Sequence, residues 1–112
     1  MHEVGLMQDA MTIVLDHAAR ADARRVRSIS MRVGEISGVA PDALQFAFQV
    51  VSRETSAEGA RLDIETVPVV CRCRTCRRDF EPANAFYNCP YCGTSTEIMR
   101  GKEFQVVSIE VD

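Results

Sequence analysis

The sequence predicts an α+β fold in which two helices pack on a small three-stranded mixed sheet, with a cysteine-rich module inserted between the last two strands. Three observations lead to this prediction. Apolar residues recur with the 3.6-residue period of a helix in two segments, residues 4–20 and the segment that begins at Pro41. Apolar and polar residues alternate, as in half-buried strands, over 26–33, 61–67 and 103–111. All five cysteines lie between the second and the third of these strands.

Length, charge and apolar content exclude several classes of protein. A chain of 112 residues forms one ordinary domain, or a small domain that carries a smaller module. Its formal net charge of −3 argues against a dedicated nucleic-acid binder, which is usually basic. No apolar run approaches the roughly 20 residues of a membrane-spanning helix, and residues 1–20 lack the basic start of a secretory signal. We therefore expect a cytoplasmic protein that binds neither nucleic acid nor a membrane.

The first helix is expected over residues 4–20, with one face buried. Its apolar stripe follows the spacing i, i+4, i+7, i+8 and i+11: Met7, Met11, Val14, Leu15 and Ala18. The methionines are predicted to fill the core rather than to relay metal, because the thioether side chain is flexible and apolar. His17 lies off the strongest part of the stripe, and we predict a surface histidine rather than a ligand.

The segments at 26–33 and 61–67 are expected to be strands separated by the second helix. Their core-facing residues are Ile29, Met31, Val33, Leu62 and Ile64. Pro41 suits the first turn of the helix, Asp42 adds favourable charge there, and Gly59 is predicted to end it. The buried stripe of this helix is expected to be Leu44, Ala47, Phe48 and Val51. A strand, helix, strand series at this spacing predicts a right-handed parallel crossover.

The last strand, 103–111, changes phase along its length. Its apolar residues fall in two registers, Phe104 and Val106 followed by Val107, Ile109 and Val111. A β-bulge near Val106 would account for the change. The strands on either side of the cysteines are predicted to be antiparallel neighbours, with the module at the tip of an extended hairpin. This divides the chain into a body, residues 1–67 plus 103–112, and a ribbon, residues 68–102.

The ribbon carries two C-x2-C pairs, which together are typical of a site for one tetrahedral metal ion: Cys73, Cys76, Cys89 and Cys92. Pro90 and Gly93 suit the tight turn in which backbone N–H groups point at the sulfurs. Cys71 is left over, as a core thiol, an accidental neighbour or an alternative ligand to Cys73. The C-x2-C spacing favours Cys73.

Zinc is the predicted ion, which makes the module a zinc ribbon. An odd number of cysteines and the lack of a secretory signal argue against disulfides. A thioredoxin-like redox pair would need only one C-x2-C. Iron in a rubredoxin-like centre has the same ligand spacing and stays open as an alternative.

The first three residues carry a second set of metal donors. Initiator methionine is generally removed only ahead of small residues, so Met1 is expected to remain before His2. The Met1 amine, the His2 backbone nitrogen and the His2 imidazole can form fused chelate rings around one cation. A fourth donor would come from the Glu3 backbone nitrogen, its carboxylate or another loop. Nitrogen donors in a plane suit Ni(II) or Cu(II), although such a start is common and needs context.

Taken together, these features resemble the HypA/HybF family of hydrogenase nickel-incorporation proteins over essentially the full chain. The matching stretches are Met1-His2-Glu3, the Gly34-Glu35 loop leading into Leu44 through Phe48, the two C-x2-C pairs, and the closing Val107-Ser108-Ile109-Glu110. Many families share a four-cysteine ribbon. Met-His-Glu at the start of the chain together with such a ribbon is much more specific.

The resemblance implies a nickel metallochaperone. It implies that Ni(II) is bound as cargo through Met1, His2 and Glu3, and that a structural zinc ion sits on the four paired cysteines. It also implies delivery to the precursor of the large subunit of a NiFe-hydrogenase, with the GTPase HypB as partner, and service to urease in some members. An acidic residue before the second helix would be a further nickel ligand, and Asp42 is the nearest candidate. We expect a monomer or a weak homodimer.

Two other classes compete with this interpretation. A zinc-ribbon nucleic-acid or transcription adaptor needs a basic surface, but the Lys, Arg, Asp and Glu residues of 68–102 leave only about +1 once Zn(Cys)4 contributes −2. A rubredoxin-like electron carrier would hold iron in place of zinc. An enzyme is not expected, because a four-thiolate site has no open coordination position and the chain shows no nucleophile–base constellation or phosphate loop.

Overall fold

Residues 2–82 and 87–112, the part of the chain that the computed structural model describes, form two helices and six strands. In chain order the elements are α1 (His2–Arg20), β1 (Val26–Gly34), α2 (Pro41–Val51), β2 (Arg61–Val67), β3 (Val70–Arg72), β4 (Asp79–Phe80), β5 (Glu97–Arg100) and β6 (Phe104–Val111). The predicted α+β class is confirmed, with each predicted helix and strand present. α1 begins at His2, two residues before the predicted start, so the first turn of the helix includes His2 and Glu3 of the predicted metal donors.

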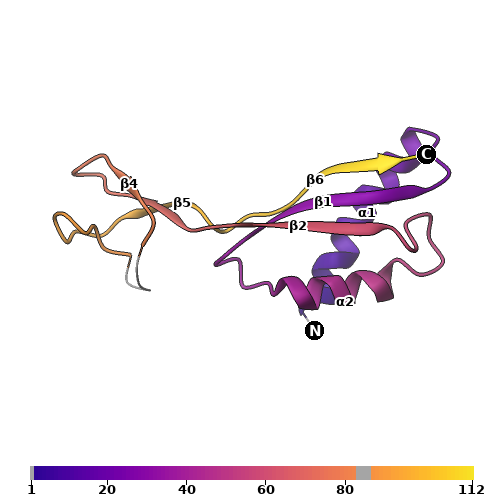
Figure 1. The fold of residues 1–112 in the computed structure, drawn as a ribbon, viewed down its shortest axis with the longest axis horizontal. Helices are drawn as coiled ribbons and strands as arrows, with labels where there is room; N and C mark the ends of the chain where they lie inside the picture. Colours follow the sequence, from indigo (N-terminus) through magenta and orange to yellow (C-terminus); the bar gives the residue numbers. More distant parts are fainter. Residues whose placement is uncertain (1, 83–86) are drawn as a thin grey trace.

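The body contains a three-stranded sheet with the strand order β2-β1-β6. β1 pairs parallel with β2 and antiparallel with β6, which confirms the mixed sheet and the parallel pair. Figure 1 shows the three strands running side by side with both helices packed along them. Both helices contribute buried side chains to one core with Ile29, Met31 and Val33 of β1.

The prediction that the strands flanking the cysteines are neighbours was wrong, because β1 lies between β2 and β6. β1 is the most deeply buried of the three strands. A central position covers its apolar side chains and pairs both of its backbone edges, which an edge strand cannot do. The antiparallel arrangement occurs further along the chain, where β3 pairs with β5 inside the ribbon.

A β-bulge in β6 brings its two registers onto the same core, as predicted. Ser30 of β1 pairs with Ser108 and the next residue, Met31, pairs with Val106, so that Val107 has no partner in the ladder. The residues of β6 that pack against the core therefore lie on both sides of the bulge: Phe104, Val106, Ile109 and Val111. Val107 instead points outward, with 47% of its surface exposed.

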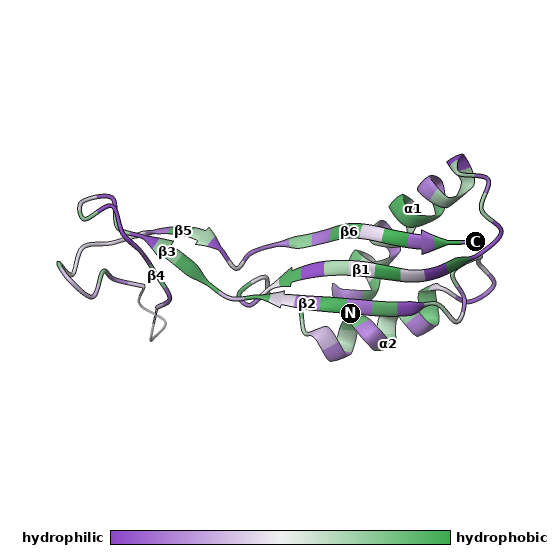
Figure 2. Cartoon of the chain, turned by 45° about the horizontal axis from the view of Figure 1, so that its top comes forward, coloured by the Kyte–Doolittle hydropathy of each residue, from purple (hydrophilic) through white to green (hydrophobic). Residues whose placement is uncertain are grey.

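The apolar stripes of both helices face the core as predicted, although Leu15 of α1 and Val51 of α2 are only partly buried. In α1 the buried residues are Met7, Ala10, Met11, Val14 and Ala18, and in α2 they are Leu44, Ala47 and Phe48. His17 is exposed, in agreement with a surface role. In Figure 2 the hydrophobic colour follows α1 and the strands of the body and extends to β3, whereas the loops at the ribbon end are mostly pale or hydrophilic.

The predicted end of the second helix at Gly59 was wrong, since α2 ends at Val51 and Ser52 is its C-cap. Glu54 adopts a φ of 64°, which the helix cannot accommodate. The Thr55 hydroxyl then donates to the Ser52 carbonyl at 2.6 Å and closes a separate turn. Gly59, with a φ of 80°, stands in the turn that leads into β2.

The ribbon forms a second small sheet with the strand order β4-β3-β5. The whole molecule is elongated, with extents of 55 × 28 × 17 Å, and the two sheets lie at opposite ends of the long axis (Figure 1). Short β3, β4 and β5 strands and few buried apolar residues leave the ribbon with little core of its own.

A narrow waist joins the two sheets. The loop after β1 is hydrogen-bonded to both connecting segments, since Glu35 N–H donates to the Val67 carbonyl and Ile36 N–H donates to the Gly101 carbonyl, each at 2.8 Å. Gly34 N–H donates to the Glu103 carbonyl at 2.7 Å. The backbones approach so closely that a Cβ on Gly34 would lie 2.5 Å from the Lys102 nitrogen and closer still to the Gly101 carbonyl.

Candidate metal centre

The four paired cysteines converge at the far end of the ribbon. Cys73 and Cys76 follow β3, whereas Cys89 and Cys92 precede β5, and all four sulfurs lie within 4.8 Å of one another. The Sγ atoms of Cys73 and Cys92 are 3.5 Å apart, and those of Cys76 and Cys89 are 3.9 Å apart. Tetrahedral ligands at about 2.3 Å from zinc lie about 3.8 Å from each other. The sulfur positions therefore fit one tetrahedral ion.

The two C-x2-C turns share one backbone design. In each, the N–H of the first cysteine, Cys73 or Cys89, donates to the carbonyl five residues later at 3.0 Å. The N–H four residues after that cysteine donates back to its carbonyl, at 2.7 Å in the first turn and 2.8 Å in the second. This fourth residue has a positive φ in both, 55° at Arg77 and 75° at Gly93. In the first turn this position is an arginine. In the second turn it is a glycine, the residue that adopts a positive φ most readily.

Arg77→Gly is expected to stabilise the metal-loaded chain by about 0.5 kcal/mol. Relief of left-handed strain, about 1–2 kcal/mol, outweighs the extra entropy that glycine has in the unfolded chain, about 0.5–1 kcal/mol. Denaturant unfolding of the metal-loaded protein measures the difference. Arg74→Gly is the matched control, because Arg74 is also exposed but is not among the positive-φ residues of the described chain. Arg74→Gly should lower the free energy of unfolding, and equal effects of the two substitutions would contradict the prediction.

Backbone N–H groups point at the sulfurs, as the turn residues predicted. Cys76 N–H donates to the Cys73 sulfur at 3.3 Å, and Tyr91 N–H donates to the Cys89 sulfur at 3.4 Å. The Cys76 N–H, followed by the Thr94 hydroxyl, lowers the pKa of Cys73 to about 6. The pKa of Cys76 is raised to about 12, chiefly because its proton is hydrogen-bonded to the Cys92 sulfur and because burial disfavours the charged thiolate. A divalent cation removes this conflict, since it lets all four sulfurs ionise together.

Cys71 does not belong to the cluster. It is fully buried in β3, where it faces Phe80 of β4 and Ile98 of β5 in the ladder. The structure therefore groups Cys73, rather than Cys71, with the other three sulfurs, in agreement with the C-x2-C spacing.

At the other end of the chain, the structure places two of the three predicted nickel donors and leaves Met1 outside the described residues. His2 Nδ1 lies 3.8 Å from Glu3 Oε2, and the His2 side chain is 59% exposed. The Glu3 side chain is only 17% exposed. Its carboxylate accepts hydrogen bonds from its own backbone N–H and from that of Ala40, which lower the pKa of Glu3. Glu3 thus ties the start of α1 to the residue that precedes α2.

Asp42 is not brought into this group. It is exposed in the first turn of α2. Over residues 2–82 and 87–112, the four cysteines are the one set of three or more His, Cys, Asp or Glu side chains close enough to share an ion. The described donors at the N-terminus are His2 and Glu3.

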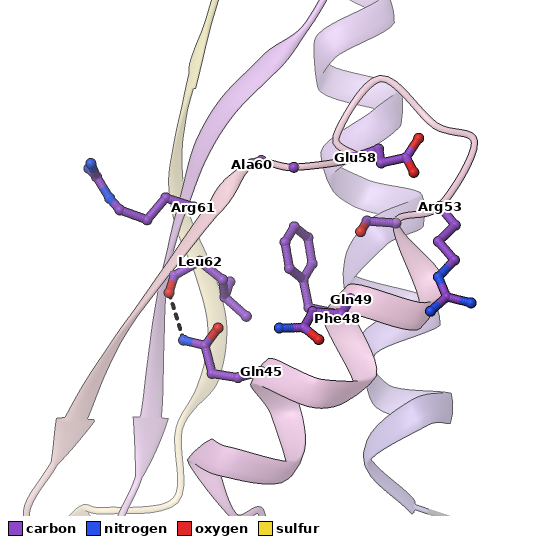
Figure 3. A pocket seen from close by; sticks show the side chains of 10 residues that line it. Gln45, Phe48, Gln49, Arg53, Glu58, Ala60, Arg61 and Leu62 are labelled. Carbon is purple, nitrogen blue, oxygen red and sulfur yellow. Dashed lines mark hydrogen bonds between the residues drawn. The ribbon is translucent and has the colours of Figure 1, made fainter.

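A groove of about 470 Å³ runs between α2 and β2 (Figure 3). Gln45 closes one end, since its Nε2 donates to the Leu62 carbonyl at 2.7 Å. Neither a thiol nor an imidazole lines the groove, so it is separate from both sets of metal donors. Within the described residues, neither helix is long and apolar enough to cross a membrane.

Sequence reasoning missed two groups that the structure brings to these sites. One is the Ala40 N–H on Glu3, which no local pattern reveals because the partners are 37 positions apart in the sequence. The other is the Thr94 hydroxyl, 3.0 Å from the Cys92 sulfur. A hydroxyl residue two positions after the last cysteine was an available signal.

Comparisons with known proteins agree on one family. The family model described as hydrogenase/urease nickel incorporation, metallochaperone, hypA matches residues 1–111. The chain is 47% identical over 112 residues to the hydrogenase maturation factor HypA of Picosynechococcus sp., with 99% of each chain covered. It is 38% identical over 114 residues to that of Syntrophus aciditrophicus, with 100% of each covered.

Solved structures share the fold. A solution structure of a HypA protein matches with a TM-score of 0.76 at 25% identity, covering 99% of this chain and 96% of the other. The solution structure of the nickel metallochaperone HypA from Helicobacter pylori matches with a TM-score of 0.69 at 23% identity, over 97% and 96% of the two chains. At that identity the second match speaks for the fold alone.

Proposed function

Because the chain belongs to the HypA family of hydrogenase nickel-incorporation metallochaperones, we propose that it binds Ni(II) at its N-terminus and delivers the ion during maturation of a NiFe-hydrogenase. The family match over residues 1–111 carries this proposal. Nickel is cargo here, and no catalytic step is proposed for the chain. Urease is a second recipient to test, because the description of the family model includes it.

The proposed nickel ligands are the Met1 amine, the His2 imidazole and backbone nitrogen, and the Glu3 backbone nitrogen. The position of His2 supports this set, because α1 begins there and the first four N–H groups of a helix have no acceptor inside the helix. Metal can therefore replace these protons without breaking a backbone hydrogen bond inside α1; the bond that is lost is the one from the Glu3 N–H to its own carboxylate. The exposed imidazole leaves the ion accessible to a recipient that supplies its own ligands.

His2→Ala is expected to lower nickel affinity by more than about 100-fold, because it removes a direct ligand, and outer-shell changes alone cost about 10–100-fold. The measurement is nickel titration of untagged protein with metal analysis. His17→Ala is the matched control, since His17 is also exposed on α1 but lies at its other end. Zinc content should stay constant in both. Unchanged nickel affinity in His2→Ala, or in protein with residues fused before Met1, would disprove the N-terminal site.

We further propose that Cys73, Cys76, Cys89 and Cys92 hold a structural zinc ion and that residues 68–102 fold around it as a domain separate from the body. The sulfur spacing and the N–H groups aimed at the sulfurs support this assignment. A site with four thiolates leaves no position for substrate or water, so the ion would stabilise the ribbon rather than react. Metal analysis of the purified chain distinguishes zinc from iron, and a coloured iron centre would favour the rubredoxin-like alternative.

The proposed partners follow from the family. They are a HypB-type GTPase, the precursor of a hydrogenase large subunit and, where urease is served, its accessory proteins. We propose a cytoplasmic monomer or weak homodimer. Copurification of the chain with the hydrogenase precursor, lost when the ribbon or the N-terminus is altered, would identify which end docks.

A further inference from the structure

Thr94 lies beside the four-cysteine centre, between its two C-x2-C turns. Its Oγ1 is 3.0 Å from the Cys92 sulfur and 3.5 Å from the Cys73 sulfur. Those two sulfurs belong to different turns and are themselves 3.5 Å apart. One hydroxyl is thus placed where it can donate to a ligand from either half of the site.

The Thr94 side chain is held in this place by its backbone. The Thr94 carbonyl accepts the Cys89 N–H at 3.0 Å, and a bridge between Asn88 and Ser95 flanks that bond. The corresponding position of the first turn is Arg78, whose guanidinium lies 4.7 Å from the centroid of the Tyr91 ring. The two turns therefore share a backbone design, but the second adds a hydroxyl next to the sulfurs.

The negative charge of the metal-bound four-cysteine centre favours a hydrogen-bond donor at the position of the Thr94 hydroxyl. Four thiolates and one divalent cation leave a net charge of −2, which hydrogen-bond donors around the sulfurs must stabilise. A metal-bound thiolate carries no proton, so the single hydroxyl proton is shared between the two sulfurs, with the shorter contact to Cys92. Hydrogen bonds to an ionised acceptor are stronger than those between neutral groups.

We propose that Thr94 is a positioning residue of the four-cysteine centre: its hydroxyl shares one proton between the Cys92 and Cys73 thiolates, joins the two turns and slows release of the bound ion. This inference rests on the proposed structural zinc. It assigns Thr94 no direct bond to the metal.

The test compares zinc transfer from purified full-length variants to a chromophoric chelator. Thr94→Val keeps the branched shape without the hydroxyl, and we expect zinc transfer about tenfold faster than in the wild type, as for other outer-shell changes. Thr94→Ser keeps the hydroxyl and should retain the wild-type rate. Thr75→Val is the matched control, because Thr75 is an exposed threonine within the first C-x2-C pair. It should leave the rate unchanged.

Substitution of cobalt(II) for zinc shows whether the Thr94 side chain acts on the charge of the thiolates or only through packing. Loss of the hydroxyl makes the Cys92 sulfur a stronger donor, so the thiolate-to-cobalt charge-transfer band should move to lower energy in Thr94→Val. Thr94→Ala, a second variant without a hydroxyl, should show the same shift, and Thr94→Ser should not. Cobalt at the N-terminus would add nothing to this band, because the proposed donors there include no thiolate.

Each outcome has a definite meaning. Wild-type transfer rates and spectra in Thr94→Val, in a protein that holds one zinc ion per chain, would overturn the role of Thr94 and leave the proposed zinc site intact. Faster zinc transfer in Thr94→Ser together with a wild-type rate in Thr94→Val would also overturn it, because the methyl packing rather than the hydroxyl would then matter. A wild-type chain that takes up no zinc would overturn the zinc site itself, and the inference with it.

Discussion

Removal of the metal from the four-cysteine centre is expected to unfold residues 68–102 while the β2-β1-β6 sheet stays folded. Among the described residues, the body has a core of 14 buried residues, whereas the buried apolar positions of the ribbon are Val69 and three cysteines. Structural zinc contributes about 10–16 kcal/mol to folding in zinc-finger peptides at pH 7, far more than such a small apolar core supplies. The waist does not replace this energy, because the hydrogen bonds described for it reach Val67, Gly101 and Glu103, which lie at the border between ribbon and body.

The chain offers a spectroscopic probe of this event. It has two tyrosines and no tryptophan, and both Tyr87 and Tyr91 lie in the ribbon. Chelation, or the change Cys73→Ser, should abolish the tyrosine signal in near-ultraviolet circular dichroism and leave the far-ultraviolet helix signal in place. Cys71→Ser is the matched control, since Cys71 is equally buried but outside the cluster, and it should retain one zinc ion. A tyrosine signal that survives complete chelation would contradict the prediction.

Gly34→Ala is expected to destabilise the body by more than about 4 kcal/mol, the range of exceptional single substitutions. Its Cβ would meet the backbone of Gly101 and Lys102, which no side-chain rotation can relieve. The backbones would have to separate, and the bonds from Gly34 N–H to Glu103 and from Ile36 N–H to Gly101 would break. The expected loss of stability comes from the close approach of the two backbones rather than from backbone strain, because Gly34 is not among the glycines with a positive φ.

Gly5→Ala is the matched control. Gly5 is exposed in α1, and a Cβ there would meet nothing within 4 Å. Alanine should therefore stabilise the helix by about 0.5–1 kcal/mol. Urea unfolding followed by far-ultraviolet circular dichroism measures both variants. Similar urea midpoints for Gly34→Ala and the wild type would contradict the prediction, because they would show that the backbones of the waist can separate without loss of stability.

Local patterns predicted most of the body because each of its elements has a clear period. Met7 to Ala18 repeat as a helix, and Ile29, Met31 and Val33 alternate as a strand, so burial follows from spacing. The phase change in β6 even predicted a bulge near Val106, and the structure places it at Val107. The partner of β6 could not be predicted this way, because alternation says which side chains face the core and not which neighbouring strand accepts the hydrogen bonds.

The same limit applies to the sites. C-x2-C spacing predicted which four sulfurs meet, since each pair is a local turn with its own hydrogen bonds. Thr94 and the Ala40 N–H act across elements, and their roles depend on distances that only the folded chain defines. Gly34 looked like an ordinary loop glycine. Its role depends on Gly101, which lies beside it only after both sheets have formed.

The central place of β1 also sets an order of assembly. The Ser28 hydroxyl donates to Glu110 across 82 residues of sequence, so the body sheet cannot close before β6 has been synthesised. Until then one edge of β1 stays unpaired and open to other chains.

Residues 68–102 leave the ribosome earlier and lie inside the loop that must be closed. A folded, metal-loaded ribbon shortens that loop and so lowers the entropy lost when β6 docks. Supply of the metal ion would then govern how long each newly made chain is exposed to aggregation.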